Sequence, residues 1–149
     1  MKMKMASLLA SLLAGTALAD ETRHVYRLDF VINESDEGKT PTATTCTLNL
    51  EEKRGGEIKL GNNISLPGKG NLRADVGLML HASVTSAGDD LLVDDDVEIT
   101  AAKDAQSFRK MSAKGNALVT PGKPALVASV EDPISHKRYQ VMLTASKLR

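Results

Sequence analysis

The sequence has little of the chemistry on which many enzymes and small secreted domains depend. It contains one cysteine, Cys46, so an intramolecular disulfide is excluded. Aromatic residues make up 3% of the chain and tryptophan is absent, which weakens the case for a sugar-binding platform of stacked rings. Lysine plus arginine and aspartate plus glutamate number 19 each, so no excess of positive charge favours nucleic acid or an anionic membrane.

Motifs for catalysis and metal binding are also missing. The histidines His24, His81 and His136 lie on different predicted elements, whereas a zinc site needs three or four ligands that converge. The chain has no G-x-S-x-G elbow, Walker loop or H-E-x-x-H motif. Cys46 has no histidine or aspartate placed beside it, which favours a buried inert thiol over a reactive one. The sequence therefore predicts a protein that is not an enzyme, with no catalytic, cofactor-binding or metal-binding residues and no cofactor.

The first residues form a targeting segment rather than part of the fold. Two early lysines precede an apolar run over 6–14, and Ala17-Leu18-Ala19 is an A-x-A cleavage site. The apolar run is far shorter than the roughly 20 residues that cross a bilayer as a helix. We therefore expect a signal peptide over 1–19 and cleavage near Ala19-Asp20. The mature chain is expected in the periplasm or outside the cell, with no membrane-spanning segment after signal removal.

What the mature chain has in abundance is alternation of apolar and polar residues. The pattern is longest over 72–101, where two runs with a period of two residues flank a turn at 86–90. This pattern predicts a long β-hairpin. In the first run the period places Leu78 on the buried face and His81 on the exposed face.

Shorter runs with the same period lie on both sides of this hairpin. They predict strands at 24–33, 44–51, 57–60, 107–112, 117–120, 125–130 and 137–146. Glycine-containing stretches at 54–56, 61–63 and 115–116 are read as turns or breaks between them. Only 101–111 could instead form a helical turn. The prediction is a single all-β domain over 20–149, a two-sheet β-sandwich-like domain of about eight or nine strands.

An acidic cluster near the hairpin end supplies an alternative function. Its members are Asp89, Asp90, Asp94, Asp95 and Asp96. Because calcium prefers oxygen ligands, the stretch from Asp89 to Asp96 could serve a periplasmic ligand- or metal-binding β-sandwich. The spacing is not that of a D-x-D-x-D-G loop, however, and alternation directs Asp95 to the face opposite Asp94 and Asp96. A solvated hairpin end is therefore the preferred interpretation.

Four segments, taken in order, carry a resemblance to a known family. Leu60 to Pro67 is similar to V-G-x-x-I-P-I-P, and Ala74 to Leu80 is similar to a D-V-G-I-x-L strand. Leu91 to Thr100 is similar to the strand that follows in that pattern, with its Glu98-Ile99-Thr100 ending. Val119 to Val130 is similar to v-x-x-G-q-t-v-v-I-G-G-L. These segments resemble the β-domain of bacterial secretins, the outer-membrane channels of secretion and pilus systems. The match covers roughly Leu60 to Val130. Ala128-Ser129 stands where the family has Gly-Gly, and the family's P-x-L-G-x-I-P segment does not follow.

The resemblance implies a secretin-like β-domain in an exported envelope protein. It implies a structural or assembly role without catalysis, and association with further copies of the chain or with another envelope protein. The charge balance predicts no nucleic-acid partner.

Overall fold

The computed structural model of the chain describes residues 23–65, 73–102 and 107–149, and these residues form an all-β structure. Its eight strands are β1 (Val25–Ser35), β2 (Thr42–Glu51), β3 (Gly55–Ser65), β4 (Arg73–Ala87), β5 (Asp90–Ala102), β6 (Phe108–Val119), β7 (Pro124–Glu131) and β8 (Arg138–Lys147). The predicted fold class is confirmed. Within the same residues there is no helix long and apolar enough to cross a membrane. The predicted signal peptide over 1–19 lies outside the described residues.

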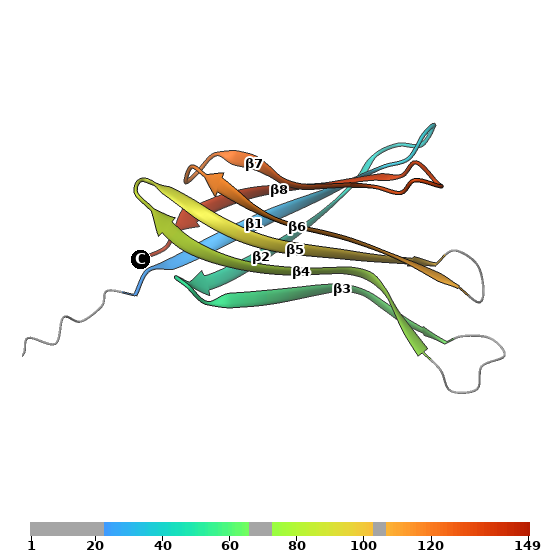
Figure 1. Ribbon diagram of the computed structural model, residues 1–149, viewed down its shortest axis with the longest axis horizontal. Coiled ribbons are helices and arrows are strands. Elements are labelled where there is room, and N and C mark those ends of the chain that lie inside the picture. The colour runs from blue at the N-terminus through green and yellow to red at the C-terminus, as the bar shows by residue number, and fades with distance from the viewer. Residues whose placement is uncertain (1–22, 66–72, 103–106) are drawn as a thin grey trace, which may run out of the picture.

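The strands form two antiparallel sheets that lie one above the other (Figure 1). Sheet A has the strand order β2-β1-β8-β7, and sheet B has the order β3-β4-β5-β6. Two short connections pass between the sheets, from β2 to β3 and from β6 to β7. As a result β2 lies beside β3 along one side of the sandwich, and β6 lies beside β7 along the other.

Alternate residues of the strands face the opposite sheet and form one core. The largest fully buried side chains are apolar and come from both sheets: Leu28, Phe30, Leu80, Val84, Val93, Val97, Val119, Val141 and Leu143. The predicted register of the central hairpin is confirmed, because Leu78 packs against this core whereas His81 is exposed. Burying each such apolar side chain contributes about 1.5–3 kcal/mol, which makes this shared core the main source of stability.

The loop of the β4–β5 hairpin is shorter than the turn predicted at 86–90. Only Gly88 and Asp89 lie outside the strands, and Gly88 has a positive φ of 68°. A glycine at the first position of a two-residue loop suits the twist of antiparallel strands. Two residues predicted as turn, Ser86 and Ala87, therefore belong to β4.

Two other predicted breaks are wrong and a third extends too far, because neighbouring strands hold the backbone extended. Residues 61–63 continue β3 because they pair with β4, and residues 115–116 continue β6 because they pair with β5. Gly55 and Gly56, read as part of a turn, begin β3. The possible helical turn is also wrong where the structure describes it, since Phe108–Val119 is a strand.

The turn between β2 and β3 joins the two sheets instead of closing a hairpin. The backbone N–H of Glu52 donates to the carbonyl of His24 at 2.9 Å, and that of Lys53 donates to the carbonyl of Val84 at 2.7 Å. A nearby hydrogen bond of 3.0 Å joins the hydroxyls of Tyr26 and Ser86 across the sheets. These bonds fix the sandwich at this corner, next to the core.

Two glycines allow β3 and β4 to approach closely where the hairpin bends. Gly61 and Gly77 are register partners, and Gly77 has a positive φ of 145°. A Cβ on Gly77 would collide with the carbonyl oxygen of Leu60 and lie 2.5 Å from the Cα of Gly61. Pairing of β4 with β5 starts at Gly77, so residues 73–76 pair with β3 alone. In Figure 1 this end of β3 and β4 bends away from β5 and β6.

We predict that Gly77→Ala lowers the urea midpoint strongly. A side chain at this φ costs about 1–3 kcal/mol before the backbone collision is counted. Gly55→Ala is the matched control on β3, because its added Cβ would have its nearest contact at 3.8 Å, with the carbonyl oxygen of Ala82. Equal midpoints for the two variants would contradict the described bend.

Candidate functional site

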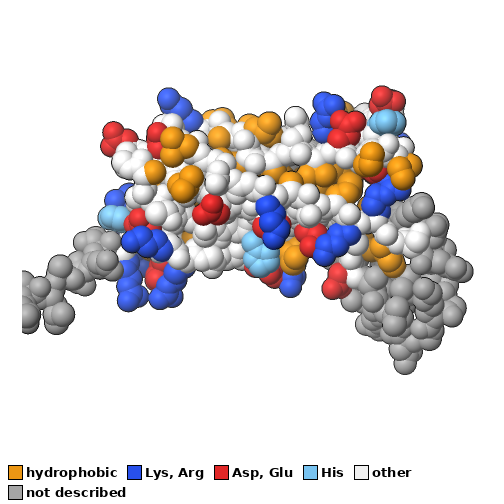
Figure 2. All heavy atoms as spheres, viewed as in Figure 1, with side chains coloured by type: hydrophobic (Ala, Val, Ile, Leu, Met, Phe, Trp, Pro, Cys, Tyr) orange, Lys and Arg blue, Asp and Glu red, His pale blue; other side chains and the backbone are white. Residues whose placement is uncertain are grey.

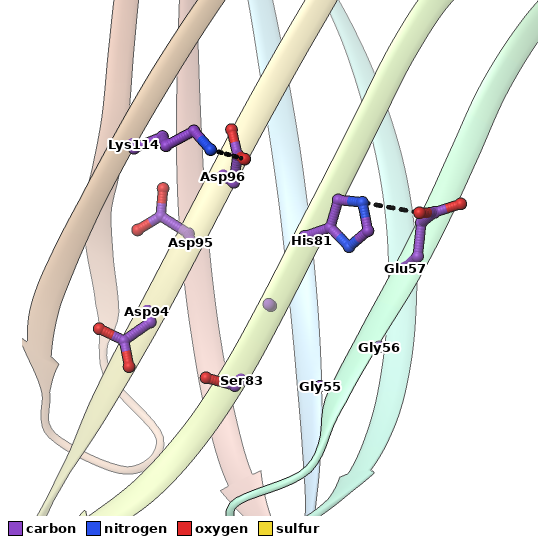
Figure 3. Close-up of a pocket in the computed structure, with 10 residues that line it drawn as sticks. Gly55, Gly56, Glu57, His81, Ser83, Asp94, Asp95, Asp96 and Lys114 are labelled. Carbon is purple, nitrogen blue, oxygen red and sulfur yellow. Dashed lines mark ion pairs between the residues drawn. The ribbon is translucent and has the colours of Figure 1, made fainter.

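A polar groove of about 520 Å³ lies on the outer face of sheet B (Figure 3). It crosses all four strands of the sheet. Its lining residues are Gly55, Gly56 and Glu57 of β3, His81, Ala82 and Ser83 of β4, Asp94, Asp95 and Asp96 of β5, and Lys114 of β6. We call this surface the polar groove. It contains one of the three histidines and three of the five clustered aspartates.

Four ionisable side chains of the groove form one row in register across four strands. The row runs Glu57, His81, Asp96 and Lys114. His81 Nε2 lies 2.6 Å from Glu57 Oε2, and Lys114 Nζ lies 2.7 Å from Asp96 Oδ2 (Figure 3). Exposed pairs of this kind contribute only about 0–1 kcal/mol each. Each acidic side chain of the row thus lies beside a nitrogen-bearing side chain of the neighbouring strand.

The ion pairs shift proton affinities in the direction expected of mutual stabilisation. The ammonium of Lys59, 2.7 Å from Glu57 Oε1, lowers the pKa of the Glu57 carboxyl. The hydrogen bond to Asp96 raises the pKa of Lys114. Figure 2 shows acidic and basic side chains interspersed over the visible face of the molecule, with hydrophobic side chains between them.

The structure separates the members of the predicted acidic cluster. Asp94 and Asp96 lie on the outer face of β5, whereas Asp95 is 5% exposed and faces the core, as the alternation predicted. Among the residues that the structure describes, no group of three or more His, Cys, Asp or Glu could hold a metal ion. The calcium alternative therefore receives no support from the part of the chain seen here.

The remaining residues singled out in the sequence are far apart in the fold. His24 precedes β1 and its ring meets that of Tyr26 edge to face at 6.4 Å, while His136 lies in the loop between β7 and β8. Cys46 is a free, half-buried cysteine on β2. Burial raises the pKa of the Cys46 thiol, which favours the unreactive protonated form.

A second pocket, of about 430 Å³, opens between the sheets at the end where they splay apart in Figure 1. Its apolar walls include Ile32 of β1, Leu78 of β4 and Ile99 of β5. The charged groups among its lining residues are Glu34 and Lys137, and they pair with each other at 2.7 Å. The pocket thus offers an incoming ligand apolar contact, but no unpaired charge among its described lining residues.

One buried polar cluster escaped sequence reasoning. Asp132 is 5% exposed and accepts hydrogen bonds from the Arg109 guanidinium, the backbone N–H of Ile134 at 2.9 Å and the Ser135 hydroxyl at 2.7 Å. These donors, Ser135 foremost, hold the pKa of the Asp132 carboxyl well below its usual range. The cluster ties β6 to the loop after β7. Asp132 precedes a proline and is followed three residues later by Ser135, which is a local turn signal. This signal could have predicted the contact of Asp132 with Ser135, but not the contact with Arg109.

Three solved structures resemble this arrangement along 85% of the chain. The type II secretin GspD from enteropathogenic Escherichia coli aligns with a TM-score of 0.64 at 9% identity, over 70% of its own chain. The injectisome secretin InvG from Salmonella SPI-1 aligns with a TM-score of 0.61 at 12% identity, over 65% of its chain. The type II secretin XcpQ from Pseudomonas aeruginosa gives 0.54 at 11% identity, over 58%. The chain has a secretin-like fold.

At these identities the likeness establishes the fold of a secretin segment and nothing more specific. The secretin-like domain spans between 58% and 70% of those three chains. No protein-family model and no curated protein matches its sequence.

The resemblance noted in the sequence has a structural counterpart. Residues 60–65 of the first segment lie on β3, while its residues 66–67 are outside the described residues. The segments that start at Ala74 and Leu91 lie on β4 and β5, and these three strands are adjacent in sheet B. The glycines of the first two segments, Gly61 and Gly77, are the pair at the bend. The segment from Val119 to Val130 crosses from sheet B to sheet A.

We predict that Asp132→Asn lowers the melting temperature at neutral pH, because the amide loses charge-assisted bonds to Arg109. The pKa of Asp132 is lower in the folded chain than its unfolded value of 3.8, so its contribution is present above that value. The contribution is lost as the pH falls towards the folded pKa, and the gap between variant and parent should narrow in acid. Asp94→Asn, on the exposed face of β5, is the control. Coinciding melts of parent and Asp132→Asn at neutral pH would exclude this role.

Proposed function

We propose that this protein is a non-enzymatic, exported envelope protein whose secretin-like β-domain has a structural or assembly role. The predicted signal peptide over 1–19 supports export, with a mature chain that is periplasmic or secreted. The secretin-like fold supports a place among envelope assemblies, since one similar structure is described as a complex of a secretin with its pilotin. The strongest support for the proposal comes from the edge strands of the two sheets, and from one of them in particular.

Each sheet ends in strands that have a partner on one side only. These edges are β2 and β7 in sheet A, and β3 and β6 in sheet B. An edge strand presents a row of backbone N–H and C=O groups to any strand that approaches it. Natural proteins discourage such pairing with charged residues, prolines and bulges.

Three of the edges carry such features. On β6, Arg109, Lys110 and Lys114 are cationic. On β7, Pro124 starts the strand and a register shift lies between Leu126 and Ala128. On β3, residues beyond Gly61 stay paired with β4 but bend with it away from β5 and β6 (Figure 1).

The edge formed by β2 is different. From Thr42 to Leu50 it has no charged residue and no proline, and four of its nine residues are β-branched threonines. It pairs with β1 in continuous register from Thr42 to Glu51. An uncharged, β-branched edge of this length, in continuous register with its neighbour, is suited to strand addition. We infer that β2 is the edge through which the domain associates, and that a second copy is its partner in a two-fold antiparallel β2–β2 pair.

We predict that the mature chain forms dimers whose population rises with concentration in sedimentation velocity experiments. Thr45→Lys should abolish them, because it places a charge on the exposed side of the β2 edge. Thr40→Lys adds the same charge to the exposed loop before β2 and is the control. A chain that stays monomeric at all concentrations would refute self-association, and dimers that persist in Thr45→Lys would refute the β2 edge.

A further inference from the structure

Asp95 places a carboxyl group inside the core of the sandwich. It lies on β5 between Val93 and Val97, which are both fully buried, and is itself 5% exposed. Within the described part of the chain, neither of its carboxylate oxygens has a hydrogen-bond partner. An ionised carboxylate in such a position is strongly unfavourable, whereas a neutral carboxylic acid is much less so.

The strands beside Asp95 provide no polar side chain to compensate. Its register partners are Ala82 on β4 and Gly115 on β6, and Ala82 is in turn paired with Gly56 on β3. The row across sheet B therefore consists of small residues with one carboxyl among them. A Cβ built on Gly115 would lie 3.8 Å from Asp95 Oδ1 and 3.8 Å from the carbonyl oxygen of Val127.

Sheet A, packed against this row, contributes an apolar surface. Its buried or half-buried core side chains include Leu48 and Leu50 of β2, Leu28 and Phe30 of β1, Val141 and Leu143 of β8, and Val127 and Ala128 of β7. The ammonium of Lys114 and the imidazole of His81, both close by in sheet B, are on the outer face and engaged with Asp96 and Glu57. No cation among the described residues pairs with Asp95.

These surroundings determine the proton affinity of Asp95. Burial raises its pKa to about 6, and the charges of Asp94 and Asp96 on the same strand act in the same direction. The carboxyl is therefore protonated in mild acid and ionised in neutral or alkaline solution. Asp132, the other buried aspartate, shows the opposite behaviour because four donors surround its carboxylate.

We propose that protonation of the Asp95 carboxyl controls how tightly the two sheets pack against each other. In acid the neutral carboxyl lies against sheet A and the sandwich closes. When the proton leaves, the charge has no partner in the core, and sheet B loosens around β5 and β6. This device does not depend on how the domain associates, since Asp95 is not on an edge strand.

The sign of the effect follows from linkage. The folded pKa of Asp95 is raised above its unfolded value of 3.8, so its protonation favours the folded state. The resulting stability is fully present below the unfolded value and is lost as the pH rises through about 6. The melting temperature of the mature chain should therefore fall between about pH 5 and about pH 7.5, where ordinary aspartates no longer titrate.

The test is thermal unfolding of the mature chain across this range, compared with Asp95→Asn and Asp94→Asn. Asp95→Asn removes the titrating group at nearly constant volume and should abolish most of the fall. Asp94→Asn removes a neighbouring charge from the outer face and should retain it. The proposal would be overturned if the melting temperature of the unsubstituted chain rises with pH. It would also be overturned if Asp95→Asn shows the same fall in melting temperature with pH as the unsubstituted chain.

Because Asp95→Asn could fold poorly for other reasons, the carboxyl of the parent is also titrated directly by carbon-13 NMR. The expected midpoint is near 6 for the Asp95 carbon, well above that of Asp132, whose pKa is lowered by its hydrogen-bond donors. A midpoint for Asp95 at or below about 4 would overturn the proposal independently of any variant.

Discussion

Burial of one face of each sheet against the other is the constraint on which the rest of this structure depends. The side chains of Phe30, Leu80 and Leu143 are fully buried, although they come from three strands and both sheets. Because alternate residues on a strand point to opposite faces, a slip of one residue would expose this core and bury the polar groove. The same constraint places Asp95 inside, since its neighbours Val93 and Val97 must face sheet A. The fold thus holds the Asp95 carboxyl in the core and leaves the row from Glu57 to Lys114 on the outer face.

Much of this arrangement could be predicted because period-two patterns report burial directly. The opposite faces of Leu78 and His81, and of Asp95 and Asp94, follow from the pattern alone. Strand continuity through Gly61 and through residues 115–116 could not be predicted, because it depends on pairing with β4 and β5 and not on local preference. For the same reason the sequence does not show that the turn after β2 joins the two sheets. Its backbone bonds to His24 and Val84 belong to two sheets that the sequence does not show together.

The candidate sites likewise show which features follow from local sequence and which depend on contacts between distant strands. The acidic cluster was visible in the sequence, but its members fall in the hairpin loop and on two faces of β5, so proximity in sequence did not predict a site. The Asp132 cluster was missed because Arg109, its charged donor, lies on another strand. The secretin-like segments were recognised from order and spacing, and three of them prove to be neighbours in sheet B. The resemblance in the sequence and the fold of the structure agree.

The central claim is that a closed two-sheet core leaves β2 as the edge available to a partner. Amide hydrogen exchange of the mature chain, measured in dilute and in concentrated solution, tests it most directly. In dilute solution β1 and β8, which are paired on both sides, should be the slowest strands of sheet A, and β2 should exchange faster. On concentration, the new protection should appear within Thr42–Glu51 and leave β6 unchanged. Protection that appears on β6 or on the outer faces while β2 stays fast, or central strands that exchange as fast as the edges, would contradict this account.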